Sequence, residues 1–120
     1  MIEVIPDVAS NVVAFRAKGK VTGQDYETVL IPAVEAAVKE HGKIRLLYHI
    51  GDEFSGFEAG AMWDDAKVGL KHFTAWERIA VVTDVDWMRN LARFFGFVMH
   101  GHVRVFKNDQ YSEAEDWIKA

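Results

Sequence analysis

The sequence predicts an α/β protein: a mixed, mainly parallel β-sheet with an N-terminal β-hairpin and about four helices, in the order β-β-α-β-α-β-α-β-α. Two observations support this fold class. Short β-type runs alternate with longer segments whose apolar residues recur at helical spacing, which is typical of parallel strands joined by crossover helices. The first two β-type runs are separated only by turn-forming residues, which predicts an antiparallel pair. We expect one domain over residues 1–120, since this length is enough for a single core.

The N-terminal third of the chain supplies the hairpin and the first helix. Residues 2–5 and 12–17 are the two β-type runs, joined by the turn-rich stretch PDVASN. Thr22 is placed to act as the N-cap of a helix that begins at residue 23 or 24. Pro32 lies inside this helix and predicts a kink or a restart, because proline lacks an amide proton. Gly42 ends the helix in the usual way.

The remaining elements follow the same alternation of short apolar runs and helical stripes. The run at residues 78–83 is almost entirely apolar, as expected of a buried central strand. In chain order, these elements are a strand at 43–50, a helix at 59–73, a strand at 78–83, a helix at 87–98, a strand at 102–106 and a terminal helix opened by Ser112.

The two faces of the predicted sheet differ in polarity. One face carries Arg45, His49 and Arg104 beside Leu47 and Phe106. We therefore expect helices to cover one face well and the other incompletely. Such a face favours self-association, and a homodimer with twofold symmetry is the commonest form of it.

The composition excludes several classes of function. The formal net charge is −4 with no basic stripe, which argues against a nucleic-acid binder. The absence of cysteine excludes disulfides and thiolate chemistry. No secretory signal or membrane-spanning run is visible, so we expect a cytoplasmic protein. No nucleophile elbow, phosphate loop or metal motif occurs. We accordingly expect neither an enzyme nor a cofactor or metal site.

A candidate regulatory loop lies in the stretch GDEFSGFEAGAMWDD, from residue 51 to 65. Its members are Asp52, Glu53, Ser55 and Glu58. Ser55 and Glu58 have the spacing of a capping box in front of an apolar helix, and helix capping is the simpler interpretation. The alternative is a phosphorylation switch, since a phosphate at a helix N-terminus is stabilised by the helix dipole. The surrounding acidic residues oppose added negative charge.

The segment WMRNLARFFGFVMHG contains a predicted helix with an unusually wide apolar arc, because Met88 and Met99 add to its apolar stripe. Its spacing predicts a core stripe made of Trp87, Leu91, Phe94, Phe95 and Val98. The alternative is an exposed surface for a protein partner or an apolar ligand. Peripheral membrane contact is the weakest interpretation, because only two arginines would be available to bind anionic headgroups. The candidate surface residues are Trp63, Trp87, Met88, Phe94, Phe97 and Met99.

Two motifs, W-D-D-x-K-x-G-x-K-H at residues 63–72 and ERIAVVTDVDW at residues 77–87, resemble the SpoIIAA-like branch of the STAS superfamily. The resemblance implies a STAS-like fold of successive strand–helix units. STAS proteins include anti-sigma-factor antagonists, in which a kinase phosphorylates a serine after the third strand, and Ser55 occupies that topological position. By fold analogy, the resemblance also invites comparison with CRAL-TRIO carriers of hydrophobic ligands.

The sequence therefore predicts a non-enzymatic, cytoplasmic STAS-like module that binds or regulates an unidentified protein partner. The first alternative is a carrier or sensor of an apolar small molecule or lipid, held between the second and third helices. The second alternative is a serine-phosphorylation switch of the anti-sigma-antagonist type.

Overall fold

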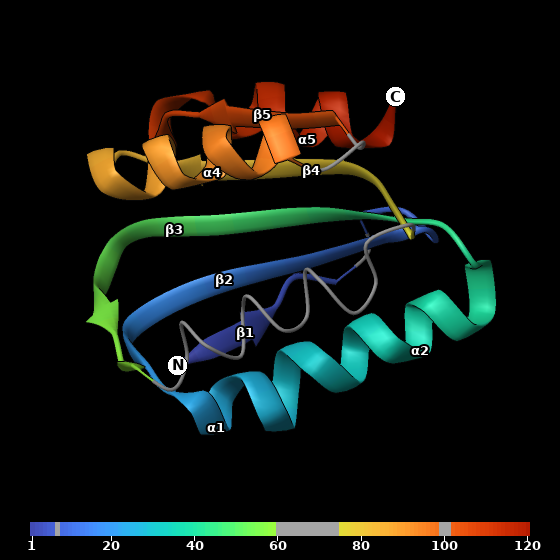
Figure 1. Ribbon diagram of the computed structural model, residues 1–120, viewed down its shortest axis with the longest axis horizontal. Helices are drawn as coiled ribbons and strands as arrows, with labels where there is room; N and C mark the ends of the chain where they lie inside the picture. The colour runs from blue at the N-terminus through green and yellow to red at the C-terminus, as the bar shows by residue number, and fades with distance from the viewer. Residues whose placement is uncertain (7, 60–74, 99–101) are drawn as a thin grey trace.

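The structure is a computed structural model that describes residues 1–6, 8–59, 75–98 and 102–120, with the side chains of Phe95, Phe97, Val98 and His102 left out. Five strands form one sheet in the order β1-β2-β3-β4-β5 (Figure 1). β1 is antiparallel to β2, and all other neighbours are parallel. The mainly parallel α/β sheet with its N-terminal hairpin is thus confirmed. The strands are β1 (Ile2–Val4), β2 (Val12–Val21), β3 (Ile44–Phe57), β4 (Trp76–Thr83) and β5 (His102–Phe106).

β2 and β3 extend well beyond their predicted ends. Their C-terminal parts pair with each other from Gly19 opposite Phe54 to Val21 opposite Phe57, through two irregularities in register. Gly19 adopts a φ of 57°, which glycine tolerates at low cost. β4 ends earlier, because its last paired residue, Thr83, lies opposite Ile50. The end of β3 therefore runs past β4 and bends, alongside the end of β2, toward α1 (Gly23–Asp25), as Figure 1 shows.

The first helical segment follows the predicted local signals. The Thr22 hydroxyl accepts a hydrogen bond from the Asp25 amide at 3.2 Å, and the Asp25 carboxylate accepts one from the Thr22 amide at 2.8 Å. This capping box opens α1 (Gly23–Asp25), and a π-helical turn, η1 (Tyr26–Leu30), follows. α2 (Ile31–His41) restarts with proline in its first turn, as predicted, because that position needs no amide donor.

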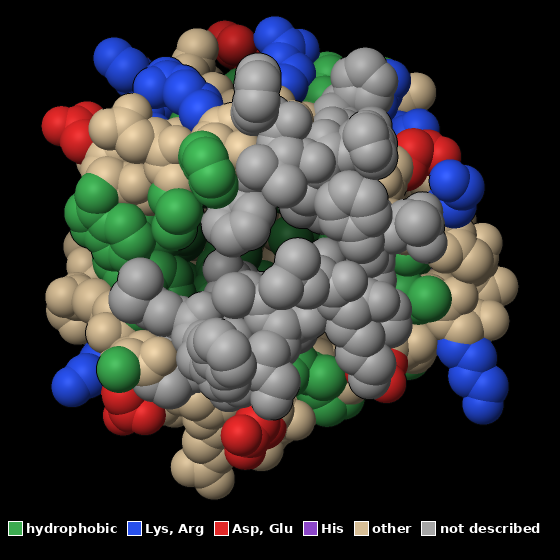
Figure 2. All heavy atoms as spheres, viewed as in Figure 1, with side chains coloured by type: hydrophobic (Ala, Val, Ile, Leu, Met, Phe, Trp, Pro, Cys, Tyr) green, Lys and Arg blue, Asp and Glu red, His purple; other side chains and the backbone are tan. Residues whose placement is uncertain are grey.

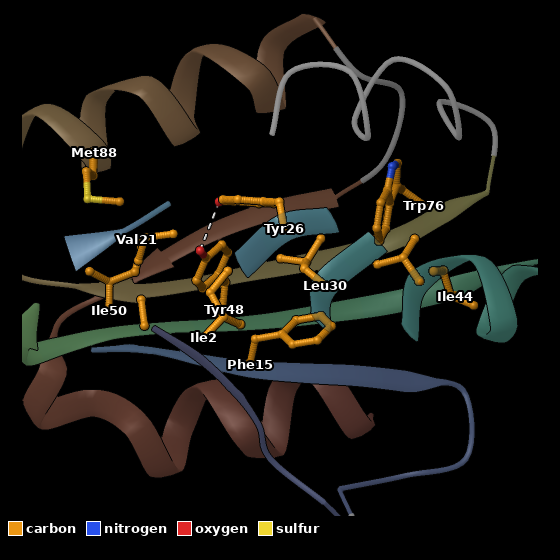
Figure 3. Packing of buried hydrophobic residues seen from close by; sticks show 12 residues of the cluster. Ile2, Phe15, Val21, Tyr26, Leu30, Ile44, Tyr48, Ile50, Trp76 and Met88 are labelled. Atoms are coloured by element: carbon orange, nitrogen blue, oxygen red, sulfur yellow. Dashed lines mark hydrogen bonds between the residues drawn. The ribbon is translucent and has the colours of Figure 1, made fainter. Parts of the chain in front are cut away.

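One face of the sheet is covered by α1, η1, α2 and α4 (Asp86–Val98), and these helices enclose the larger core cluster (Figures 1 and 3). Phe15 and Ile44 are fully buried in it. The hydroxyl groups of Tyr26 and Tyr48 lie 2.9 Å apart inside this cluster, so each polar group has a partner in an apolar setting. The helix predicted at residues 59–73 lies outside the described residues except for Ala59.

The opposite face is covered, in the part of the chain that the structure describes, by η2 (Asn108–Gln110) and α5 (Tyr111–Lys119). α5 begins at Tyr111, one residue before the predicted start at Ser112. The core on this side is the smaller cluster of Ala14, Leu47, Ala80, Val82, Phe106, Ala114 and Ile118.

Two arginines of the sheet hold the C-terminal end of α5. Arg45 donates to the carbonyl of Ile118 at 2.9 Å, and Arg78 donates to the carbonyl of Trp117 at 2.8 Å. The last carbonyls of a helix lack partners within the helix and carry partial negative charge, which favours guanidinium groups there. Arg45 therefore helps to attach a helix to the face that the sequence predicts to be incompletely covered. No described helix is both long and apolar enough to cross a membrane.

Candidate binding surface on α4 and the end of β3

The exposed side of α4 carries large apolar residues. Trp87, Leu91 and Phe94 are 47 %, 40 % and 62 % exposed. At about 100° per residue, these three positions fall within an arc of about 60° on the helix. Met88 and Ala92, each 8 % exposed, face the core instead. The predicted core stripe is therefore wrong for its three members whose side chains the structure describes.

Close packing of α4 on β5 explains this orientation. A Cβ atom built on Gly96 would lie 3.0 Å from the Cβ of Val103, so the helix approaches the strand as closely as a glycine allows. Ala92, one turn earlier, is also small and buried. The small residues at this spacing turn toward the sheet, and the adjacent arc of large residues is left facing outward.

Two phenylalanines at the end of β3 extend the apolar surface of α4. The rings of Phe57 and Trp87 are 6.2 Å apart between centroids in an edge-to-face arrangement, and those of Phe54 and Phe57 are 4.9 Å apart. Both distances lie in the favourable range for aromatic pairs. We call the set of Phe54, Phe57, Trp87, Leu91 and Phe94 the aromatic patch. Figure 2 shows hydrophobic side chains gathered toward the left of the view, where Figure 1 places α4 and the end of β3.

Acidic residues lie along the two segments that form the aromatic patch. Asp52, Glu53 and Glu58 are exposed at the end of β3, and Asp84 and Asp86 are exposed at the start of α4. Both segments lie at the same edge of the sheet, because parallel strands end on the same side. We call these five residues the acidic rim.

Two basic side chains near the acidic rim already interact with other groups of the protein. Lys18 lies 3.6 Å from the Glu53 carboxylate and 3.3 Å from that of Glu3. Arg89 donates to the carbonyl of Thr83 at 3.0 Å, which anchors the start of α4. The two segments therefore carry carboxylates beside the apolar residues, although Lys20 at the end of β2 and Arg93 on α4 are also exposed. Glu53, adjacent to Phe54 in the strand, points to the opposite face of the sheet.

The candidate regulatory loop is part of a strand. Ser55 lies inside β3 with an exposed side chain, and the first helical residue after it is Ala59. The capping-box prediction for Ser55 and Glu58 is therefore wrong. The Glu58 amide instead donates to the carbonyl of Val21 at 2.8 Å, so pairing with β2 satisfies the backbone where a cap was expected. Asp52, Glu53 and Ser55 are strand residues, and Glu58 follows the strand directly.

The structure separates the predicted surface residues into three groups. Trp87 and Phe94 are exposed, and Met88 is a buried core residue. Trp63 and Met99, and the side chain of Phe97, lie outside the described residues. Sequence reasoning did not assign Phe54, Phe57 or Leu91 to this surface. The small residues at positions 92 and 96, four apart, could have indicated which side of the helix packs closely.

Among the described residues, no group of three histidine, aspartate or glutamate side chains is placed to hold a metal ion. The aromatic patch and the acidic rim together present apolar contact area and carboxylates. Such an arrangement can bind a partner or an apolar ligand.

Comparison with known proteins assigns the family. The profile of a family described as SpoIIAA-like matches residues 12–119. The chain belongs to this SpoIIAA-like family. A comparison with proteins of curated function found no match.

Two solved structures share the fold of this SpoIIAA-like chain. An uncharacterized protein of the DUF3478 family from Shewanella loihica PV-4, with a SpoIIAA-like fold, is 29% identical over 98% of this chain and 93% of its own, with a TM-score of 0.75. The anti-sigma factor antagonist SpoIIAA in its unphosphorylated form is 14% identical over 100% of this chain and 99% of its own, with a TM-score of 0.63. At 14% identity the second likeness concerns the fold alone.

Proposed function

We propose that this SpoIIAA-like chain is a non-enzymatic binding and regulatory module whose protein partner docks on the aromatic patch. The observation that carries the proposal is the exposure of Trp87, Leu91 and Phe94 on one side of α4, while Met88 and Ala92 make the core contact. Large apolar residues gathered on one surface are typical of interaction sites. Tryptophan and other aromatic residues are also enriched in the centres of protein interfaces.

The acidic rim indicates the chemistry of the partner. A partner with an apolar anchor and flanking lysines or arginines would complement both the aromatic patch and the carboxylates on the same two segments. An anionic membrane surface fits less well, because it would be repelled by the same carboxylates. A basic amphipathic helix, which presents an apolar stripe between cationic residues, is the simplest segment that meets these requirements.

The proposal is tested by site-specific photo-crosslinking. A photoreactive amino acid replaces Leu91 on the aromatic patch, and a matched control carries it at Glu113, an exposed position of α5. We expect crosslinks from position 91, absent from position 113, to a protein segment in which basic and apolar residues alternate at helical spacing. Competition by the free peptide of that segment should abolish them. Equal crosslinking from both positions, or crosslinks to acidic or wholly polar segments, would contradict the proposal.

A carrier of an apolar small molecule or lipid is the second candidate, because an acyl chain could also occupy the exposed aromatic side chains. Native mass spectrometry of gently purified protein distinguishes the two candidates. A reproducible added mass of lipid size, lost in the Trp87→Ala variant, would favour the carrier. In the same spectra, an added phosphate mapped to Ser55 would favour the phosphorylation switch, which the exposure of that serine on β3 permits.

A further inference from the structure

His49 lies where β2, β3 and the start of α5 meet, on the sheet face opposite the aromatic patch. Its neighbours across the sheet are Arg16 on β2 and the apolar Val82 on β4. The Nε of Arg16 donates a hydrogen bond to Nδ1 of His49 at 3.4 Å. The imidazole contacts the ring of Tyr111, the first residue of α5, in a tilted arrangement with 4.8 Å between ring centroids and 48° between the ring planes.

The contact with Arg16 selects one tautomer of the neutral ring. A guanidinium group has only donors, so Nδ1 of His49 must offer its lone pair, and the proton of the neutral imidazole is on Nε2. The space beside Nε2 is narrow, since a Cβ atom built on Gly51 would lie 3.3 Å from it. A side chain at position 51 would therefore require the ring to shift by a few tenths of an ångström.

A second proton on His49 conflicts with its surroundings. It would occupy Nδ1, where it would point at the Arg16 donor and abolish the hydrogen bond. The imidazolium would also stand beside the first residue of α5, where the N-terminus of a helix carries partial positive charge. Burial and the Arg16 charge lower the pKa of His49, while Asn108 on η2 and the Asp52 carboxylate on β3 act in the opposite direction.

The other groups around the ring do not remove this conflict. On α5, burial and the Glu115 charge raise the pKa of the Tyr111 phenol, and Arg16 acts in the opposite direction. Tyr111 thus stays neutral across the range in which histidine titrates. β4 contributes Val82, which brings no charge at its paired position.

The attachments of α5 are unequal at its two ends. The C-terminal end is held by two arginine-to-carbonyl hydrogen bonds. At the N-terminal end, Tyr111 contacts His49, interacts with Arg16 and packs against the smaller core cluster. The Asn108 amide beside it donates a hydrogen bond of 3.0 Å to the Asp84 carboxylate. Of these contacts, the one with His49 involves a group that titrates near neutral pH.

We propose that His49 is a proton-operated latch for residues 107–119: the neutral imidazole holds the start of α5 against the sheet, and its protonation releases that end. Release would expose part of the smaller core cluster beneath α5, including Leu47 and Val82. The start of α5 is released on acidification, because the state in which it packs against the sheet disfavours protonation of His49. Neutral His49 stabilises the packed start of α5 fully above the ordinary pKa of histidine. This stabilisation decreases as the pH falls from that value toward the lowered pKa of His49.

Hydrogen–deuterium exchange of residues 107–119 tests the latch, after correction for the intrinsic pH dependence of exchange. Between pH 7.5 and pH 5, we expect the opening equilibrium of this segment to increase by up to tenfold per pH unit, the limit for uptake of one proton. In the His49→Gln variant, which cannot bind the proton, the corrected equilibrium should not change with pH. The His41→Gln variant, altered at the end of α2, should behave like the wild type.

A second measurement needs no substitution. Long-range ¹H–¹⁵N correlation spectra of the wild-type protein should show the Nε2–H tautomer of His49 at pH 7.5 and a pKa below the ordinary value of histidine. An Nδ1–H tautomer, or protection of residues 107–119 that is the same at pH 5 and pH 7.5 in the wild type, would overturn the proposal. Retention of the full pH dependence by the His49→Gln variant would also overturn the proposal.

Discussion

Replacing Phe94 with alanine should cost far less stability than replacing Met88 with alanine, although both are large apolar residues of the same helix. Phe94 is 62 % exposed, so only about two-fifths of its surface is buried. Since full burial of such a side chain contributes about 3 kcal/mol, the buried part contributes about 1 kcal/mol. Alanine also has the higher helix propensity, which offsets about 0.5 kcal/mol of that loss. We expect a net change below about 1 kcal/mol.

Met88 is only 8 % exposed, and its truncation also leaves a cavity, so we expect Met88→Ala to cost about 2–5 kcal/mol. Urea denaturation followed by far-UV circular dichroism measures both values, provided that the slope of the transition is the same in the wild type and the variants. An equal loss of stability in the two variants would refute the orientation of α4. The aromatic patch would then be part of the core, and the proposed docking surface would not exist.

Two further predictions concern the first helical segment. Gly42→Ala should lower the unfolding free energy by about 1–2 kcal/mol, because Gly42 ends α2 with a φ of 77°, which alanine adopts only at a cost; no change in the melting temperature would contradict this. Asp25 should contribute stability that is lost in acid. Burial raises its pKa, but hydrogen bonds from Thr22 and the N-terminal ammonium group bring it below the ordinary value of 3.8. Its contribution is therefore complete above that value and disappears as the pH falls through the lowered pKa, so Asp25→Asn should flatten the acid limb of stability against pH. An unchanged acid limb would show that the carboxylate is not held as described.

Local signals predicted the elements whose partners lie close in sequence. Thr22 and Asp25 form a capping box because both members belong to one turn. Pro32 interrupts the regular helix whatever the helix packs against, because the effect of proline on the backbone is local. The capping-box prediction for Ser55 and Glu58 failed. There the backbone pairs with residues 19–21 of β2, and a pairing between segments so far apart in sequence leaves no local pattern.

The orientation of α4 could not be read from periodicity alone. Trp87 and Met88 are adjacent, and the helix carries apolar residues on two neighbouring arcs, so hydrophobicity does not decide which arc is buried. Which arc is buried depends on the close contact between Gly96 of α4 and Val103 of the next strand, β5. Sequence reasoning therefore identified the helix as a candidate surface but assigned Leu91 to the core and Met88 to the surface.

The two candidate functional regions lie on opposite faces of the sheet, yet they meet at the junction between β4 and α4. Asp84 precedes α4 by two residues, and its carboxylate accepts the hydrogen bond from the Asn108 amide at the start of η2. Release of the start of α5 would therefore change the hydrogen bonding of a residue three positions before Trp87, the first member of the aromatic patch on α4. Any coupling through this link must be reciprocal. If protonation of His49 weakens partner binding by some factor, the bound partner must lower the proton affinity of His49 by that same factor.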